Sequence, residues 1–338
     1  MLIAPKAGVS GYEQQVIPYL ERIFAPYNLK ISTDFMGNCY LEKDGLSGKQ
    51  TVMLAAHLDE IGLITTHIDS RGFVHFSTVG GIDQRVLLNQ EVIIHGKKEI
   101  KGIICADNPG SNANKKAIST EDLMIDIGYP FTKAQELVQP GDIISINRSP
   151  IEILNKRIAG KALDDRAGIA VLAVCINELS YLQHSHKVIA VATVQEEVGL
   201  RGAVTSSDNL RPEIAVVIDV THAQTLDTKN QVNTLLGKGP VIALGPNIHP
   251  RIYSSLKNAA EENRIPYQIQ PIAGPTGTDA RAIQLTGCGI PTGLLSIPLR
   301  YMHTSVETVS LQDIVDGGKL LARFIASLPD DLEELSCY

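Results

Sequence analysis

The stretch TVMLAAHLD, residues 51–59, is a short apolar run that ends in a histidine and an aspartate. Three later stretches repeat this form, with metal-ligand residue types after an apolar run: VIAVATVQEE (188–197), IAVVIDV (214–220) and TGLLSI (292–297), which lies shortly before His303. Apolar runs of this length predict buried strands. In open α/β sheets, ligands bind in the crevice outside the carboxyl ends of the strands. The four stretches therefore predict one shared site at one edge of a sheet.

The composition limits the classes of protein to consider. The chain has 338 residues, which is long for one core, so we expect one large domain and a smaller one. The formal net charge is −7 and the chain has no basic stripe, which argues against nucleic acid as a partner. No apolar run approaches the roughly 18 residues that a membrane span needs, so we expect no membrane contact.

The N-terminus and the cysteines indicate a cytoplasmic protein. Residues 1–13 contain a lysine and a Gly/Ser break instead of the apolar segment of a signal peptide, so we expect no secretion. The five cysteines are scattered and form no C-x-x-C pair, which is typical of reduced thiols. They are Cys39, Cys105, Cys175, Cys288 and Cys337.

Helical and strand patterns alternate over most of the chain, which is typical of a layered α/β fold. Pro18 lies inside the first helical pattern and is expected to kink that helix or to shift its start. The spacing of apolar residues predicts helices over 10–26, 163–182, 201–207, 250–264, 279–286 and 311–328.

Residues 67–157 have a different pattern. Short strand-like runs such as FVHFSTV (73–79) are separated by Gly, Asp, Asn and Pro turns, and helical periodicity is nearly absent. We therefore expect a β-rich domain at 67–157, inserted into a discontinuous α/β domain formed by 1–66 and 158–338. The insertion carries none of the candidate site residues, so its expected role is assembly. Apolar faces such as Val92–Ile94 or Ile103–Ile104 would be covered by a neighbouring subunit.

His57 and Asp59 lie two positions apart. Residues at this spacing on a strand face the same way, so Asp59 could accept a hydrogen bond from the ring nitrogen of His57 that does not bind a metal. A surface turn is the alternative interpretation of so short a motif. The two residues indicate a metal site only when they are considered together with the other three clusters.

Two pairs of adjacent acids are further candidates. Asp164 and Asp165 open the helix at 163–182, where an acid commonly caps the helix or interacts with its dipole. The alternative is one bridging carboxylate with an orienting neighbour. Glu196 and Glu197 end an apolar strand at the predicted crevice. There, one glutamate could bind metal while the other takes a proton from bound water.

Asp219 interrupts an apolar run, and a buried carboxylate without a partner costs several kcal/mol. A metal ion would remove this cost, and an ion pair with an arginine is the alternative. His303 follows the last apolar strand, and His222 is a weaker candidate three residues beyond Asp219. Two histidines and at least three carboxylates favour two divalent cations, Zn²⁺ or Co²⁺ with Mn²⁺ as a further option, in a hydrolytic centre.

Seven stretches, in this order, resemble the TET-type dinuclear aminopeptidases, a family that includes the glutamyl and deblocking aminopeptidases and proteins labelled cellulase M. The resemblance covers nearly the whole chain, from about residue 5 to about residue 328. The stretches are VSGYE (9–13), AAHLDEIG (55–62), GKALDDRAG (160–168), QEEVGLRGA (195–203), DVTHA (219–223), GTDARAIQ (277–284) and IPLRYMHTSVE (297–307).

The resemblance implies a role for each candidate residue. His57 and Asp219 would bind one metal ion, Glu197 and His303 the other, and Asp164 would bridge the two. Glu196 would be the general base and Asp59 the partner of His57. The resemblance also implies a cis peptide bond between Asp164 and Asp165. The chain departs from the family at Asp227-Thr228-Lys229, where Asp-x-Pro is common, and this places the geometry of that loop in doubt.

The resemblance further implies a three-layer α/β/α domain of the phosphorylase/hydrolase-like zinc peptidase type, with an inserted small β-barrel similar to a PDZ fold. In this family the inserted domain makes dimer contacts, and dimers assemble into hollow tetrahedral dodecamers. We therefore expect a homo-oligomer whose partners are otherwise only peptide substrates.

The favoured function is an aminopeptidase that removes N-terminal residues from short peptides, with Glu196 deprotonating a water between two metal ions. Three alternatives remain open. The first is a metallohydrolase for another amide, such as an acyl-amino-acid deacylase. The second is a glycoside hydrolase, disfavoured because the chain has no Trp and only 5 % aromatic residues. The third is a metal-binding assembly protein without catalysis, disfavoured because Glu196 lies beside the candidate ligands.

Overall fold

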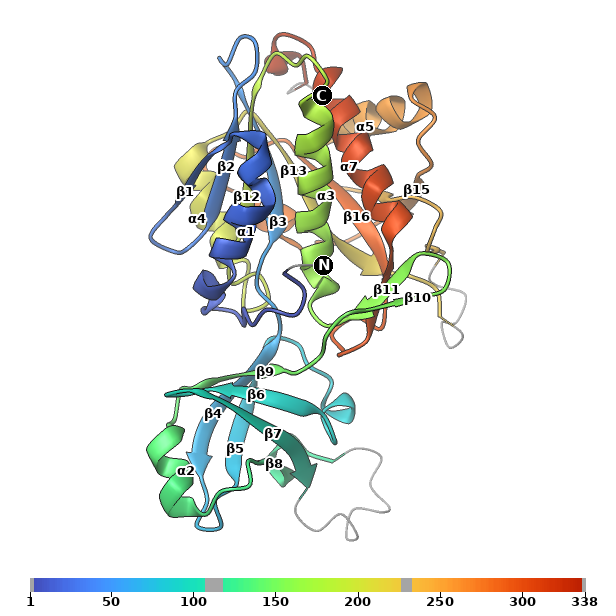
Figure 1. Ribbon diagram of the computed structural model, residues 1–338. Coiled ribbons are helices and arrows are strands. Elements are labelled where there is room, and N and C mark those ends of the chain that lie inside the picture. The colour runs from blue at the N-terminus through green and yellow to red at the C-terminus, as the bar shows by residue number, and fades with distance from the viewer. Residues whose placement is uncertain (1–2, 107–117, 226–232, 336–338) are drawn as a thin grey trace.

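The four apolar runs form the centre of one sheet as neighbouring parallel strands. β3 (Thr51–His57) lies between β12 (Lys187–Thr193) and β13 (Ile214–His222), and β13 also pairs with β16 (Thr292–Arg300). The structure, a computed structural model, describes residues 3–106, 118–225 and 233–335 (Figure 1). Because the strands are parallel, their carboxyl ends meet at one edge of the sheet, as the sequence predicts.

Shorter strands extend this sheet on both sides to eleven strands in the described residues. Several of them are exposed or half-exposed and carry no apolar run, so sequence patterns did not predict them. They are β1 (Lys30–Thr33), β2 (Cys39–Lys43), β10 (Ile151–Ile153), β11 (Arg157–Gly160), β14 (Val241–Leu244), β15 (Gln268–Pro271) and β17 (Glu307–Ser310).

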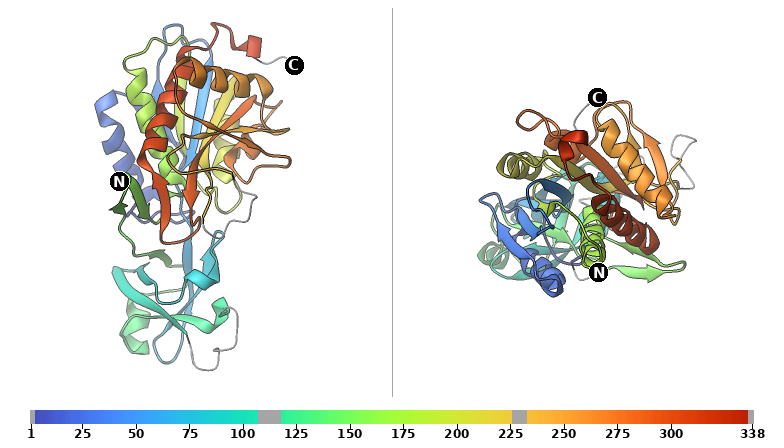
Figure 2. Two further views of the ribbon diagram at one scale, coloured as in Figure 1. Left: turned by 90° about the vertical axis from the view of Figure 1, so that its right-hand side faces the viewer. Right: turned by 90° about the horizontal axis from the view of Figure 1, so that it is seen from above.

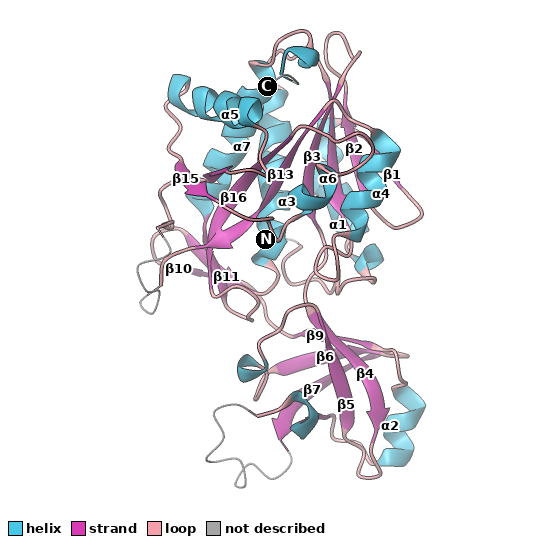
Figure 3. Ribbon diagram, turned by 180° about the vertical axis from the view of Figure 1, so that it is seen from behind, coloured by secondary structure: helices cyan, strands magenta, loops and turns pink. Residues whose placement is uncertain are grey.

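Helices cover both faces of the sheet, which confirms the expected three-layer α/β/α architecture (Figures 2 and 3). One face packs against α1 (Ile17–Phe24), α3 (Leu163–Leu179), α5 (Pro250–Glu262) and α7 (Leu311–Ala326). The other packs against α4 (Arg201–Leu210) and α6 (Asp279–Ile283). Pro18 lies in the first turn of α1, so it shifts the start of this helix and does not kink it.

A closed β-barrel with its own apolar core extends from this body (Figure 1). Its strands pair in the order β4-β5-β8-β7-β6-β9, and α2 (Phe131–Leu137) packs beside them. They are β4 (Gly62–Ile68), β5 (Val74–Val79), β6 (Glu91–His95), β7 (Glu99–Ala106), β8 (Leu123–Asp126) and β9 (Ile143–Ile146). Short 3₁₀ helices lie at Glu13–Gln15, Ala25–Tyr27, Gln84–Val86, Thr120–Asp122 and Leu332–Leu335.

The barrel differs in two respects from the expected insertion at 67–157. It begins earlier, because β4 starts at Gly62, while β10 belongs to the large sheet. In addition, Val92, Ile94 and Ile104 are fully buried inside the barrel. They point inward by the alternation of a strand, so the expectation that a partner covers them was wrong. Ile103, on the outer side of β7, is 52 % exposed.

The remaining expectations concern single features. Cys39, Cys175 and Cys288 are free thiols, as predicted, Cys105 lies near the end of β7, and Cys337 lies outside the described residues. The loop at Asp227-Thr228-Lys229 also lies outside them. Among the described helices, none combines the length and the apolar character that crossing a bilayer requires.

The close approach of α7 to α3 gives a test of this packing. A Cβ atom added to Gly318 would lie 2.5 Å from Val174 Cγ1 and 2.9 Å from the Val171 carbonyl oxygen. We predict that Gly318→Ala lowers the free energy of unfolding by about 1–3 kcal/mol, because overpacking outweighs the gain of about 1 kcal/mol in helix propensity.

Chemical denaturation measures this change, with Lys319→Ala on the exposed side of the same helix as the control. An increase in stability for Gly318→Ala would show that the two helices lie farther apart.

Candidate metal centre

The predicted site residues come together at the carboxyl edge of the parallel strands. His57 ends β3, Asp219 lies near the end of β13, and the pair Glu196-Glu197 follows β12. His303 follows β16, and Asp164 lies in the first turn of α3. All six line one crevice of about 340 Å³. Its other walls include Thr221, His222, Gln270, Ile272, Thr276, Thr278, Leu294, Ser296 and Met302.

Asp164 is the centre of this cluster. Its Oδ1 atom lies 3.1 Å from His57 Nε2, and its Oδ2 atom lies 3.4 Å from His303 Nε2. Glu197 Oε1 lies 3.4 Å from the same nitrogen of His303. One carboxylate therefore faces two histidines with its two oxygens, which is the placement that a bridging ligand requires.

The donor atoms are close enough to hold cations. Within each of three overlapping groups, the donor atoms lie within 4.8 Å of one another. Nitrogen and carboxylate donors without a thiolate suit Zn²⁺, Co²⁺ and Mn²⁺. The groups are His57-Asp164-Asp219, His57-Glu196-Glu197 and Asp164-Glu197-His303.

The electrostatics of the crevice favour positive charge. Burial, with a further contribution from Asp219 against the opposing effect of His57, raises the pKa of Glu196 to about 10. Hydrogen bonds to Asp164 and Glu197 raise the pKa of His303 to about 11. Both shifts arise from crowded, desolvated carboxylates. The potential that favours protons here also favours a divalent cation.

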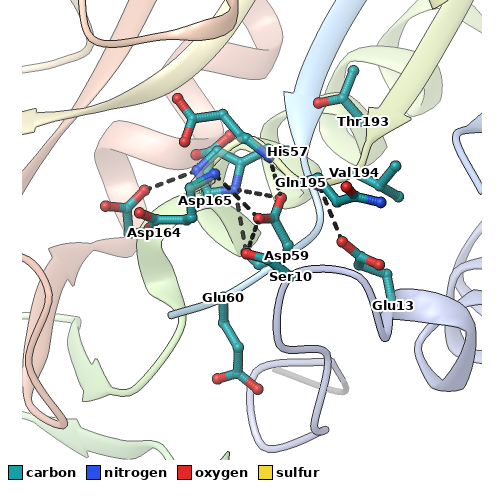
Figure 4. A network of polar contacts seen from close by, with 12 residues as sticks. Ser10, Glu13, His57, Asp59, Glu60, Asp164, Asp165, Thr193, Val194 and Gln195 are labelled. Atoms are coloured by element: carbon teal, nitrogen blue, oxygen red, sulfur yellow. Dashed lines mark hydrogen bonds and ion pairs between the residues drawn. The ribbon is translucent and has the colours of Figure 1, made fainter. Parts of the chain in front are cut away.

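Asp59 is fully buried and has more partners than the sequence predicted (Figure 4). His57 Nδ1 lies 3.5 Å from the Asp59 carboxylate and 3.2 Å from its backbone carbonyl oxygen. The carboxylate accepts hydrogen bonds from the Ser10 hydroxyl at 2.6 Å and from the backbone N–H groups of Glu196 at 3.0 Å and Glu197 at 3.2 Å. Asp59 therefore lies next to His57 and also fixes the loop that carries both glutamates.

Glu13 holds the residue before this pair, and no local pattern in the sequence indicated it. Its Oε1 atom accepts a hydrogen bond from the backbone N–H of Gln195 at 3.0 Å, although the side chain is almost fully buried (Figure 4). Gln195 has a φ of 56°, in the left-handed region. The contact therefore helps to fix a backbone conformation that an unrestrained glutamine rarely adopts.

Glu307 is a second residue that the sequence did not single out. It is 1 % exposed and accepts hydrogen bonds from the backbone N–H groups of His303, at 2.9 Å, and Asp164, at 3.1 Å. One carboxylate thus links the backbones of two candidate ligands. The one feature of the sequence that could have indicated Glu307 is its position as a single acid at the start of the strand-like run ETVS.

Two further expectations concern residues next to the ligands. The peptide bond between Asp164 and Asp165 is cis, as the resemblance implied. Asp165 accepts a hydrogen bond from the Gly168 N–H at 2.9 Å with one oxygen, so it braces the start of α3. His222 lines the crevice but belongs to none of the three donor groups found in the described residues.

A three-layer α/β/α body with histidines and carboxylates at the carboxyl edge of its parallel strands defines the class: an α/β protein with a hydrolase-type candidate metal centre. The family model of the M42 glutamyl aminopeptidases matches residues 37–320. The chain belongs to this family of peptidases, which confirms the resemblance found in the sequence.

Three relatives illustrate the similarity. The lysyl aminopeptidase of Pyrococcus furiosus is 33 % identical over 334 residues, which are 96 % of this chain and 95 % of the relative. The TET aminopeptidase of the marine sediment archaeon Thaumarchaeota archaeon SCGC AB-539-E09 has a TM-score of 0.93 at 31 % identity, covering 99 % of this chain and 97 % of that one.

The third is the Pyrococcus horikoshii TET1 peptidase, which can assemble into a tetrahedron or a large octahedral shell. Its structure has a TM-score of 0.83 at 32 % identity and covers 96 % of this chain and 98 % of that one.

The role of Glu307 yields a prediction. Glu307→Ala removes the acceptor of two buried N–H groups, so we expect the free energy of unfolding to fall by about 1–3 kcal/mol or more. Glu307→Gln keeps one acceptor oxygen and should lose less.

Denaturation of both variants, with the exposed Glu152→Ala as the control, measures the difference. Equal stability of the alanine and glutamine variants would contradict a role as a backbone acceptor.

Proposed function

We propose that this protein is a metal-dependent aminopeptidase with two divalent cations in the crevice. His57 and Asp219 would hold one cation, Glu197 and His303 the other, and Asp164 would lie between them. The proposal rests above all on Asp164, whose two oxygens face two different histidines at 3.1 and 3.4 Å. Zn²⁺ and Co²⁺ suit the nitrogen and oxygen donors best, and Mn²⁺ is also compatible.

Bound cations would supply Lewis-acid polarisation of the scissile carbonyl and lower the pKa of a water. The chain itself would move the protons. The carboxylate of Glu196 lies among the donors of His57 and Glu197, and its backbone is fixed by Asp59. The two cations would lower the pKa of Glu196 from the raised value that burial gives it, so that its carboxylate could accept the proton of the attacking water and return it to the leaving amine.

The restriction to chain ends would follow from recognition of the free α-amino group. This group would bind near a cation or beside an acidic side chain of the crevice, and an internal amide has no such group. Peptides that bear a free N-terminus are therefore the proposed substrates.

We further propose a homo-oligomer built from dimers, of which a tetrahedral dodecamer is one form. The assembly of the TET1 relative supports it, and the barrel offers the exposed Ile103 for such contacts. A closed particle would admit only short or unfolded peptides. The free thiols agree with a reducing compartment, so the cytoplasm is the proposed location. Light scattering at micromolar concentration tests the assembly, and a monomer would contradict it.

Glu196→Gln tests the proposed base. Glutamine preserves shape and packing but accepts no proton, so kcat should fall by about 10²–10⁴-fold or more. Elemental analysis should still find the wild-type number of cations per chain. Glu262→Gln on the exposed side of α5 is the control. Turnover near that of the wild type would remove Glu196 from the mechanism.

A substrate panel separates the candidate activities. Protein stripped of metal and supplied with Zn²⁺, Co²⁺ or Mn²⁺ should hydrolyse aminoacyl p-nitroanilides but not N-acyl amino acids. The stripped protein should be inactive, because its Lewis acid is missing. Cleavage of a β-glucan that persists in the presence of a chelator would instead support a glycoside hydrolase.

A further inference from the structure

The two candidate histidine ligands are oriented in the same way. Each presents Nε2 to the carboxylates of the crevice and has a backbone carbonyl beside Nδ1. For His57 this carbonyl belongs to Asp59, at 3.2 Å. For His303 it belongs to Gly81, at 2.8 Å, and the two residues are 222 positions apart in the sequence.

This contact selects one tautomer of His303. A carbonyl oxygen only accepts hydrogen bonds, so Nδ1 must carry the hydrogen. In the neutral ring that would bind a cation, the lone pair is then on Nε2, which lies 3.4 Å from both Asp164 Oδ2 and Glu197 Oε1. Metal-binding histidines generally need such a partner for the second nitrogen, since it fixes both tautomer and ring orientation.

Gly81 belongs to the barrel, in the loop between β5 and the 3₁₀ helix Gln84–Val86. The loop approaches the crevice so closely that little space is left for a side chain at Gly81 or at its neighbour Gly80. A Cβ atom at Gly81 would lie 3.2 Å from His303 Nδ1 and 3.3 Å from its Cε1. A Cβ atom at the neighbouring Gly80 would lie 3.4 Å from Glu197 Cβ. Two adjacent glycines therefore allow the backbone to touch the site.

The start of the barrel is fixed to the α/β body. Glu60, two residues before β4, is 3 % exposed and accepts hydrogen bonds from Lys161 Nζ at 2.6 Å and from the Gly8 N–H at 3.0 Å. This buried ion pair anchors the strand that leads into the barrel, so the Gly81 carbonyl lies at a defined position relative to His303.

We infer that the carbonyl of Gly81 is a positioning group for His303, so that the barrel completes one half of the metal centre. The inference rests on the proposed function. The two halves then differ, because His57 receives its carbonyl from its own segment and His303 receives it from the barrel. The insertion, whose expected role was assembly, would then also take part in the site. A shift of the barrel by about 1 Å would break the hydrogen bond between Gly81 and His303. It would lower the affinity only for the cation that His303 binds.

Titration with Co²⁺ tests this inference. Metal-stripped wild type is titrated while the visible absorption of Co²⁺ is recorded, and His303→Ala identifies the binding step that depends on this ring. Gly81→Ala should weaken that step by about 10–100-fold, the usual effect of disturbing a partner of a metal ligand. The step that depends on His57 should stay within about twofold. Asp83→Asn is the matched control, since Asp83 lies in the same loop and pairs with Arg85.

A second measurement guards against a general folding defect in Gly81→Ala. In wild type loaded with Zn²⁺ and labelled with ¹⁵N-histidine, the ring of His303 should be protonated at Nδ1. Protonation at Nε2, or Co²⁺ affinities of Gly81→Ala equal to those of the wild type, would overturn the inference and leave the proposed function intact. Failure of the wild type to bind Co²⁺ in the crevice would overturn the proposed function itself, and the inference with it.

Discussion

The crevice contains several buried carboxylates that are close together, and their charge must be compensated. The rest of the site depends on this requirement. Asp59, Asp164, Glu196 and Asp219 are each less than a tenth exposed, and they converge on the carboxyl ends of the parallel strands at the centre of one sheet. Desolvating one ion costs several kcal/mol unless opposite charge compensates it, and crowding like charges adds to that cost. Two histidines partly compensate it. Divalent cations would do so more fully, which is why the cluster fits a metal centre better than a set of ion pairs.

A second group of carboxylates accepts hydrogen bonds from the backbone of the segments that carry the candidate ligands. Glu13 accepts the N–H of Gln195, Asp59 accepts those of Glu196 and Glu197, and Glu307 accepts those of Asp164 and His303. The hydrogen bonds of Asp59 lower the pKa of its buried carboxylate, and N–H bonds to an ionised acceptor are roughly twice as strong as neutral ones. The candidate ligands therefore stand on loops whose shapes are fixed from several directions. Such preorganisation matters because small errors in the placement of catalytic groups lower rates strongly.

The barrel also supports a candidate ligand through its backbone. It follows β3 almost directly, so the chain passes from His57 and Asp59 into the barrel and brings the Gly81 loop back over His303. An inserted domain placed between two site segments can thus contribute to chemistry through its backbone alone. The relatives that assemble into shells carry the same overall fold, and an assembly that fixes the barrel would also fix this carbonyl.

The sequence predicted the parts of the fold that have strong local patterns. The four central strands contain short apolar runs, and α3 and α7 have long helical patterns, so their positions were correct to within a few residues. The exposed strands β1, β10 and β15 have no such pattern and were missed. The convergence of the candidate ligands followed from the rule for strand ends.

The supporting residues could not be predicted in this way. Contacts such as Gln195 to Glu13 and His303 to Gly81 join backbone groups to residues about two hundred positions away, and nothing in the local sequence marks them. The cis peptide bond after Asp164 was expected only from the family resemblance.

Anomalous diffraction from crystals loaded with Co²⁺ would show directly whether the crevice holds two cations. We expect two peaks in each crevice. One should lie about 2.0–2.2 Å from donor atoms of His57 and Asp219, and the other at that distance from Glu197 and His303, with Asp164 touching both. An active enzyme whose crystals show no peak between these residues would contradict this expectation.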